Sequence, residues 1–209
     1  MSKRPYEQRL RADAAQATRR RILDALYERL REAPSDPVSL DEIARRARVA
    51  RSTVYLAFGS RAGLFDALTT ELLEGAGFAR ILEAVRNPDA REHLRGGLEG
   101  GVEMYSAQRD VMRVLASMAH LDPEGVGQAV GRVERDRAAG MKRLAGKLAE
   151  QGLLRPDVTA EHAENVIWLL ASFDAFDLLA AGRGLPPDQI AELLVTTAER
   201  ALLVEAPEK

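Results

Sequence analysis

The polar side chains at residues 51–55 have the chemistry of hydrogen-bond donors: Arg51, Ser52, Thr53 and Tyr55. If residues 51–58 form a helix, Val54 and Phe58 lie four residues apart on one face, and the donors point away from it. A face with one cation, three hydroxyls and little acid suits phosphate oxygens and base edges, which accept hydrogen bonds and repel negative charge. The segment therefore predicts contact with nucleic acid.

A second short helix is predicted immediately before this segment. Ser39 precedes an apolar periodic run, and Glu42 follows three residues later. This spacing predicts a capping box, in which the Ser39 hydroxyl accepts from the amide of residue 42 and the Glu42 carboxylate reaches back. The apolar residues that follow have the spacing of one buried helix face: Leu40, Ile43, Ala44 and Ala47. Because residues 48–50 leave room only for a tight turn, the two helices form a helix-turn-helix, whose second helix enters the major groove of DNA.

Four motifs follow one another between residues 18 and 73: Ile22-Leu23-Asp24-Ala25, Ser39-Leu40-Asp41-Glu42-Ile43-Ala44, Thr53-Val54-Tyr55-Leu56-Ala57-Phe58, and Ser60-Arg61 before Leu64-Phe65-Asp66-Ala67-Leu68. In order and spacing they resemble the tetracycline-repressor (TetR) family of transcriptional regulators. The resemblance implies an all-α fold, with an N-terminal three-helix helix-turn-helix domain and a C-terminal helical bundle for ligand binding and dimerisation. We expect a basic arm at residues 1–15, the DNA-binding domain at 16–76 with its motif at 39–58, and the effector-binding and dimerisation domain at 77–209.

Three positions depart from the family pattern. Ala33-Pro34 stands where a helix-ending Gly is common, and Ala50 where Ser is usual. Arg48 occupies a turn position that usually has Gly and often a positive φ, where a non-Gly residue is strained. Two interpretations stay open: the turn has a slightly different conformation here, which we favour, or Arg48 accepts the strain and gains a phosphate contact.

We expect DNA contacts from seven side chains: Ser39, Arg48, Arg51, Ser52, Thr53, Tyr55 and Arg61. Of these, Tyr55 and Arg61 are expected to hold phosphates, and residues 51–53 to lie nearest the base edges. Residues 1–61 hold 14 Lys and Arg against 8 Asp and Glu, a net charge of +6 in a chain of net charge −2. This asymmetry favours a polyanion at the basic end, although many of the Arg residues are also expected on ordinary solvated faces.

Beyond residue 73 the pattern predicts helix after helix. Thr159 is expected to cap a helix that continues to Gly182 and is apolar on nearly all sides, and Pro186-Pro187 opens a last helix with a broad apolar stripe. Two such helices have more apolar surface than one core can cover, which indicates a subunit interface. The resemblance likewise implies a homodimer through the last two helices. Its two recognition helices would lie roughly 34 Å apart and address a palindromic site.

A ligand pocket is implied by the resemblance, which places residues of the central helices around an effector cavity: Met104, Tyr105, Met112, Met118, His120, Trp168, Phe173 and Asp174. The same residues suit a plain core. Gly96, Gly97, Gly100 and Gly101 put bare backbone on one stripe of a helix, which favours close packing over room for a ligand. Asp174 and Asp177 could pair with Arg across the dimer, line the cavity and favour a cationic effector, or face water.

Catalytic patterns are missing from the sequence. The three His residues are scattered, no Gly-rich phosphate loop or nucleophile elbow occurs, and there is no Cys. The basic N-terminus is not followed by an apolar stretch, so we expect neither a signal peptide nor a membrane anchor, and a cytoplasmic protein. We therefore predict a repressor that a small-molecule effector releases from operator DNA, not an enzyme, with no cofactor and no metal. The alternatives are a helical ligand-binding or interaction protein with a vestigial helix-turn-helix, and an architectural DNA binder without an effector.

Overall fold

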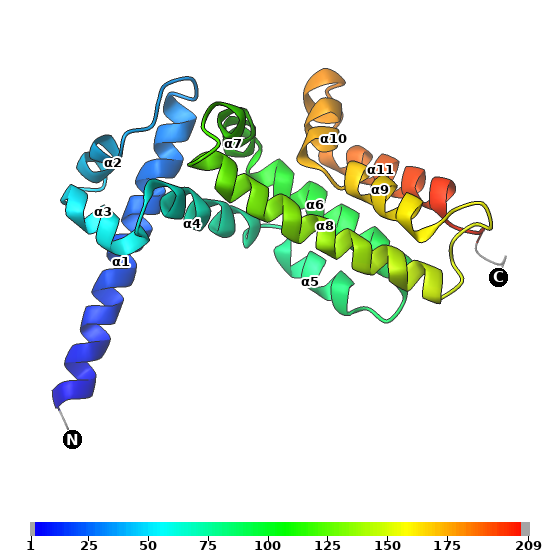
Figure 1. Cartoon of the computed structure of the whole chain (residues 1–209), viewed down its shortest axis with the longest axis horizontal. Helices are drawn as coiled ribbons and strands as arrows, with labels where there is room; N and C mark the ends of the chain where they lie inside the picture. Colours follow the sequence, from blue (N-terminus) through cyan, green and yellow to red (C-terminus); the bar gives the residue numbers. More distant parts are fainter. Residues whose placement is uncertain (1–2, 206–209) are drawn as a thin grey trace. The chain divides into compact units, whose positions relative to one another are not determined.

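The computed structural model describes the backbone of residues 3–205 and the side chains of residues 9–205 (Figure 1). Within this range the chain is helical, apart from turns and one isolated β-bridge between Leu154 and Leu203. The predicted all-α fold is confirmed. The helices are α1 (Lys3–Glu32), α2 (Leu40–Arg46), α3 (Arg51–Phe58), α4 (Arg61–Leu73), α5 (Phe78–Arg86), α6 (Ala90–Ala107), α7 (Arg109–Leu121), α8 (Val126–Glu150), α9 (Ala160–Leu170), α10 (Phe173–Asp177), the π-helix η1 (Leu178–Gly182) and α11 (Pro187–Leu202).

The chain divides into two compact units. The first contains the residues up to Thr70 together with Arg113–Val130, and the second contains Glu71–Met112 and the residues from Gly131 onward. The predicted boundary at residue 76 differs from this division, because residues 113–130 group with the N-terminal unit. Within the first unit, the Asp122 carboxylate accepts a hydrogen bond from Arg61, at the start of α4.

The core of the first unit is built on α1. Ile22, Leu26 and Leu30 repeat every four residues and are fully or almost fully buried, so this face of α1 forms part of the core, and α2 packs on α1. Residues 9–17 of α1 are exposed. Residues 3–15, expected as an arm, are the beginning of this helix, while residues 1–2 and the side chains of residues up to 8 lie outside the described part.

The second unit has α6 at its centre. Leu94 and Leu98 of α6 share a core with Leu148 of α8, Ile167 of α9 and Leu202 of α11. A second cluster joins Tyr105 of α6 to α10 and α11. Gly152 follows the end of α8 with φ 65°, a left-handed conformation that Gly adopts without strain.

The single helix expected over residues 159–182 is interrupted, and that prediction is wrong. Thr159 caps α9 as predicted, its hydroxyl accepting from the amide of His162 at 3.1 Å. The helix ends at Leu170, because the Ser172 hydroxyl accepts from the amide of Ala175 at 3.1 Å and begins α10. Among the described residues, no single helix is long and apolar enough to cross a bilayer, although α9 and the segment that follows reach that length and composition together across a 48° bend.

Candidate DNA-recognition surface and ligand cavity

The entry into α2 is fixed by a side-chain cap that differs from the predicted capping box. The Ser39 hydroxyl accepts from the amide of Asp41 at 3.2 Å rather than from residue 42. Instead of reaching back, the Glu42 carboxylate accepts from Arg29 at 2.8 Å and from Arg46 at 3.0 Å. The predicted Ser39 cap is therefore present. The predicted return bond from the Glu42 carboxylate is wrong, because Arg29 and Arg46 bind that carboxylate instead.

Arg29 is a buried cation that ties α1 to α2 and to the segment between them. Its side chain is only 4% exposed, and its guanidinium donates to the carbonyls of Ala33 at 2.6 Å and Pro37 at 3.2 Å in addition to Glu42. The hydrogen bond from Arg29 holds the pKa of Glu42 below its usual value. The planar guanidinium thus satisfies three acceptors at once, and it positions α2 on α1.

The turn between α2 and α3 puts Arg48 in the left-handed region, with φ 55°. The amide of Arg48 donates to the carbonyl of Arg45 at 3.2 Å, and the amide of Val49 donates to the carbonyl of Ala44 at 2.9 Å. These two bonds form a Schellman motif, in which the residue at the position of Arg48 has positive φ and is usually Gly. The favoured interpretation, a different turn conformation, is therefore wrong: the Arg48 backbone adopts the left-handed conformation, and its side chain is exposed.

The inner face of α3 packs on the unit through Val54, which is 1% exposed. Arg19 of α1 adds a second attachment, donating to the carbonyl of Ala57 at 2.8 Å and stacking 4.3 Å from the centre of the Phe58 ring. On the outer face, Tyr55 is 42% and Leu56 is 89% exposed. The inner face of α3 is thus packed against the unit, and its outer face is exposed to solvent.

Four of the seven predicted contacts belong to α3: Arg51, Ser52, Thr53 and Tyr55. Ser39, Arg51 and Ser52 are exposed, and Thr53 is half-buried. The Arg51 guanidinium donates to Asp41 at 2.9 Å and to the Tyr55 hydroxyl at 3.4 Å. Arg51 and Tyr55 are thus held together at the surface before any ligand binds.

Arg61 lies in a different environment from the other six predicted contacts. Its guanidinium donates to Asp122 and stacks 5.0 Å from the centre of the Phe65 ring. Burial lowers the pKa of Arg61. Asp122 also accepts from the amides of Gly125 at 3.0 Å and Val126 at 3.4 Å, where α8 begins, so this pair holds elements of the first unit together.

A cavity of about 350 Å³ lies in the second unit, among α5, α6, α8, α9, α10 and α11. Its lining is mostly apolar and includes the polar side chains of His93, Arg132, Asp136, Arg137 and Arg143. An apolar enclosure with a few polar groups is typical of sites that bind small molecules.

The glycines of α6 serve two purposes. A Cβ at Gly96 would come within 2.9 Å of the Ala84 side chain, and one at Gly100 within 2.9 Å of the carbonyl of Gly77, so this pair permits the close approach of α5. A Cβ at Gly97 would meet nothing within 4 Å, and one at Gly101 only the Tyr105 ring at 4.0 Å. Gly97 and Gly101 line the cavity. The favoured packing interpretation is therefore right for one pair, and the room-for-a-ligand alternative describes the other.

The comparisons with known proteins agree with this geometry. Residues 22–68 match the family described as "Bacterial regulatory proteins, tetR family", a segment that runs from the buried part of α1 through α2 and α3 into α4. The chain therefore carries a DNA-binding domain of the tetR type at residues 22–68. A search among curated proteins found no significant match.

Solved structures of tetR-type regulators share the fold over nearly their whole length. NalD of Pseudomonas aeruginosa, the secondary repressor of the MexAB-OprM multidrug efflux pump, is 23% identical with a TM-score of 0.72, covering 91% of this chain and 99% of its own. A TetR transcription regulator from Haloarcula marismortui is 19% identical with a TM-score of 0.68, covering 90% and 100%. The ketosteroid transcriptional regulator KstR2 of Mycobacterium tuberculosis is 18% identical with a TM-score of 0.63, covering 90% and 95%. These structural similarities show the fold alone.

Of the eight residues expected around an effector, Met104 and Tyr105 line the cavity. Phe173 packs edge-on against the Tyr105 ring, with centroids 5.6 Å apart, and Met112 packs on the same cluster. The Trp168 ring is 41% exposed and stacks on Arg137. Met118 and His120 belong to the first unit, and Asp174 is exposed.

Among the polar cavity residues that the sequence interpretation missed are His93 and Arg143. His93 lies four residues before Gly97 and therefore on the same face of α6. Extending the glycine stripe by one helical turn in the sequence would have identified it. Asp177 pairs with Arg109 of its own chain at 2.8 Å.

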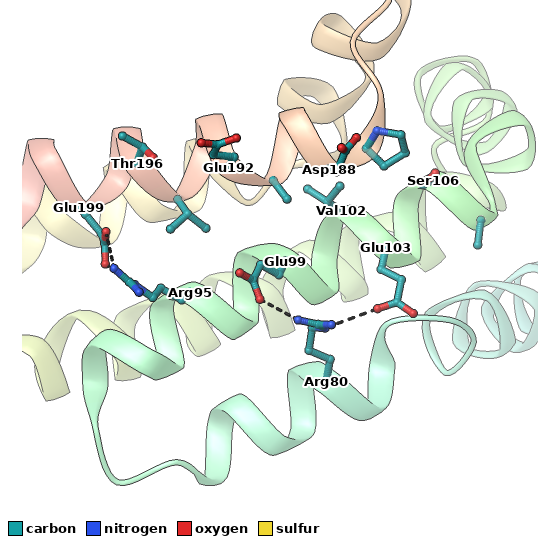
Figure 2. A pocket seen from close by; sticks show the side chains of 14 residues that line it. Arg80, Arg95, Glu99, Val102, Glu103, Ser106, Asp188, Glu192, Thr196 and Glu199 are labelled. Carbon is teal, nitrogen blue, oxygen red and sulfur yellow. Dashed lines mark hydrogen bonds and ion pairs between the residues drawn. The ribbon is translucent and has the colours of Figure 1, made fainter.

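A charged groove lies on another side of the second unit, between α5, α6 and α11 (Figure 2). Arg80 reaches Glu99 at 2.7 Å and Glu103 at 3.6 Å, and Arg95 reaches Glu199 at 2.5 Å. The charged side chains of this groove are paired with each other at an open surface, so we interpret them as attaching α6 to its neighbours. The apolar cavity is the better candidate for a ligand site.

The Arg48 turn gives a prediction on stability. Arg48→Gly is expected to raise the free energy of unfolding by about 1 kcal/mol, because Gly adopts the left-handed conformation without steric strain. Arg48→Ala keeps the strain and is the matched control, for which no gain is expected. Urea denaturation of the three proteins measures the effect, and equal stabilisation by Ala would mean that the side chain, not φ, is responsible.

Proposed function

We propose that the chain regulates transcription as a cytoplasmic homodimer, binding a palindromic operator as a repressor and leaving it when a small molecule occupies the second unit. The observation that carries this proposal is the pairing in one chain of an open recognition helix, α3, with a separate apolar cavity. The roles of NalD, a repressor, and of KstR2, a transcriptional regulator, support it. The effector would act by preferring a conformation in which the two recognition helices are wrongly spaced, which requires a difference in affinity between the two states.

For the DNA contacts we propose residues 51–53 at the base edges, with Ser39, Arg48 and Tyr55 at phosphates. Arg51 would exchange its bond to Asp41 for a bond to DNA. Arg61 we assign to a structural role, because its guanidinium is held by Asp122 and the Phe65 ring.

The proposal is tested first by selecting bound sites from random double-stranded DNA. A regulator is expected to enrich one inverted repeat and to bind it tightly at physiological salt. An architectural binder would bind without enriching a sequence, and a ligand-binding protein with a vestigial helix-turn-helix would bind no DNA. Either result would contradict the proposal.

Salt dependence distinguishes the roles of Arg48 and Arg61. Arg48→Gln is expected to weaken binding to all sequences and to reduce the slope of log affinity against log salt by about 0.9 for each phosphate that the side chain no longer neutralises. Arg61→Gln is expected to leave that slope unchanged, because its charge is already paired with Asp122. Fluorescence anisotropy at several salt concentrations measures both, after thermal melts show that the variants are folded. An unchanged slope for Arg48→Gln, or a reduced slope for Arg61→Gln, would overturn the respective assignment.

A further inference from the structure

The cavity of the second unit has a polar end and an apolar end, set by one face of α6. His93, Gly97, Gly101 and Tyr105 repeat every four residues on this face and all line the cavity. At 1.5 Å rise per residue the stripe is about 18 Å long. The two middle positions of this stripe are glycines, so main chain lines the cavity between the His93 and Tyr105 side chains.

At the Tyr105 end, the polar groups are already satisfied. The Tyr105 hydroxyl donates to the carbonyl of Ala171 at 3.1 Å, and burial raises its pKa to about 12, so it stays neutral. Arg137 donates to Glu134 at 2.5 Å and to the carbonyl of Trp168 at 2.5 Å, and Arg132 pairs with Asp136 at 3.5 Å. This end offers a ligand apolar contacts.

At the His93 end, among the residues that the structure describes, one polar atom lacks a hydrogen-bond partner and two cations lack a carboxylate partner. His93 Nδ1 is buried and has no hydrogen-bond partner. Burial, together with Lys147 and Arg143, lowers the pKa of His93, so a neutral imidazole stands in a positive field. Lys147 donates to the carbonyl of Asn87, and within the described residues no carboxylate pairs with Lys147 or with Arg143. Arg143 and Val85 line the cavity and are exposed, which places its opening near them.

We propose that the cavity binds an amphipathic carboxylate, with its anionic head at His93 and Arg143 and its apolar chain along Gly97 and Gly101 toward Tyr105. The inference rests on the proposed function and names the ligand class of that same cavity. A buried polar atom without a partner is unfavourable, and a carboxylate supplies the acceptor that the Nδ1–H tautomer of His93 requires. The cationic neighbours stabilise the charge, while the satisfied groups at the other end offer a ligand nothing polar. The sequence-based alternative of a cationic effector attracted by Asp174 has no support here, since Asp174 does not line the cavity.

Isothermal titration calorimetry of the full chain with decanoate and with decanamide, its neutral counterpart of the same size, tests the ligand class. Decanoate is expected to bind at least about tenfold more tightly than decanamide. His93→Phe and Arg143→Gln are each expected to reduce this difference, because each removes one partner of the carboxylate. Equal binding of the two probes, or no binding of decanoate, would overturn the inference.

The location of the site is tested by filling the cavity. Gly97→Leu is expected to abolish binding of both probes without changing the thermal melt, since its side chain enters open space. Gly146→Leu is the matched control, because a Cβ at Gly146 on α8 also meets nothing within 4 Å and Gly146 does not line the cavity. If Gly97→Leu does not fold, Gly101→Val makes the same test. Decanoate binding that survives the filled cavity would overturn the proposed location.

Operator affinity, measured with and without decanoate, separates this inference from the proposed function. If decanoate binds in the cavity and operator affinity is unchanged, the ligand class stands and release by an effector is wrong. If the operator is bound and decanoate is not, DNA recognition stands and the ligand class is wrong.

Discussion

Replacing Leu169 and Leu193 together by Glu is expected to convert the proposed dimer into a monomer and to weaken operator binding by about 100-fold or more. Leu169 of α9 is 58% exposed and Leu193 of α11 is 44% exposed. The same two helices bury their other faces in the core through Ile167 and Leu202. Exposed Leu side chains on these helices favour burial against a second copy, and two charges there would have to be desolvated.

The loss of affinity follows from bivalency. A dimer that has bound one half-site presents its second recognition helix at a high effective concentration, which contributes about 10²-fold to 10⁴-fold. Light scattering after size-exclusion chromatography measures the assembly, and titration with one-half-site and two-half-site DNA measures the affinity. The variant is expected to bind both DNAs alike.

Leu121→Glu is the control for this experiment. Leu121 ends α7 in the other unit and is 86% exposed, so it tests whether any exposed Leu has the same effect. It is expected to leave the assembly unchanged. A double variant that remains dimeric, or a native chain that is monomeric, would contradict the proposed interface.

Arg29→Met is expected to lower the free energy of unfolding of the DNA-binding unit by about 3–5 kcal/mol, the range for removing one partner of a buried ion pair. Met fills similar space, but the carbonyls of Ala33 and Pro37 lose their donor and Glu42 loses its bond at 2.8 Å. Urea denaturation followed by circular dichroism measures the change. Arg31→Met is the matched control, because Arg31 lies on the same helix, pairs with Glu28 at 3.5 Å and is 48% exposed. For Arg31→Met we expect the free energy of unfolding to fall by less than about 1 kcal/mol.

The ion pair also predicts a dependence on pH. Since the folded state lowers the pKa of Glu42, the stabilisation is fully present above its ordinary value of 4.5 and is lost as pH falls through the lower folded value. Glu42→Gln is expected to remove this acid-side loss. A loss of stability below pH 4.5 that is identical in Glu42→Gln would show that other carboxylates cause it.

Local sequence patterns predicted the helix-turn-helix well, because its signals are local. The predicted start of α2 at Leu40, the Ser39 cap and the bounds of α3 at 51–58 follow from neighbours within a few residues. The capping box failed because Arg29, distant in sequence, takes the Glu42 carboxylate. The conformation of Arg48 differed from the favoured prediction, since the two turn bonds that fix its φ outweigh the preference of its side chain.

The cavity was less predictable, because it depends on which helices face each other. Gly96 and Gly97 are neighbours of the same residue type, yet one meets Ala84 and the other meets open space. No spacing within α6 distinguishes them without the position of α5. The break at Ser172 was equally hidden, since a Ser in an apolar run can cap a helix or sit within one.

The division of labour among the α6 glycines bears on how such a protein diversifies. A substitution at Gly97 or Gly101 resizes the cavity, whereas one at Gly96 or Gly100 pushes α5 away. The size of the cavity and the packing of α5 can therefore be changed independently by substitutions on one helix. After a gene duplication, a copy can acquire a response to a new compound through single changes at the first pair, while selection on the second pair preserves the scaffold.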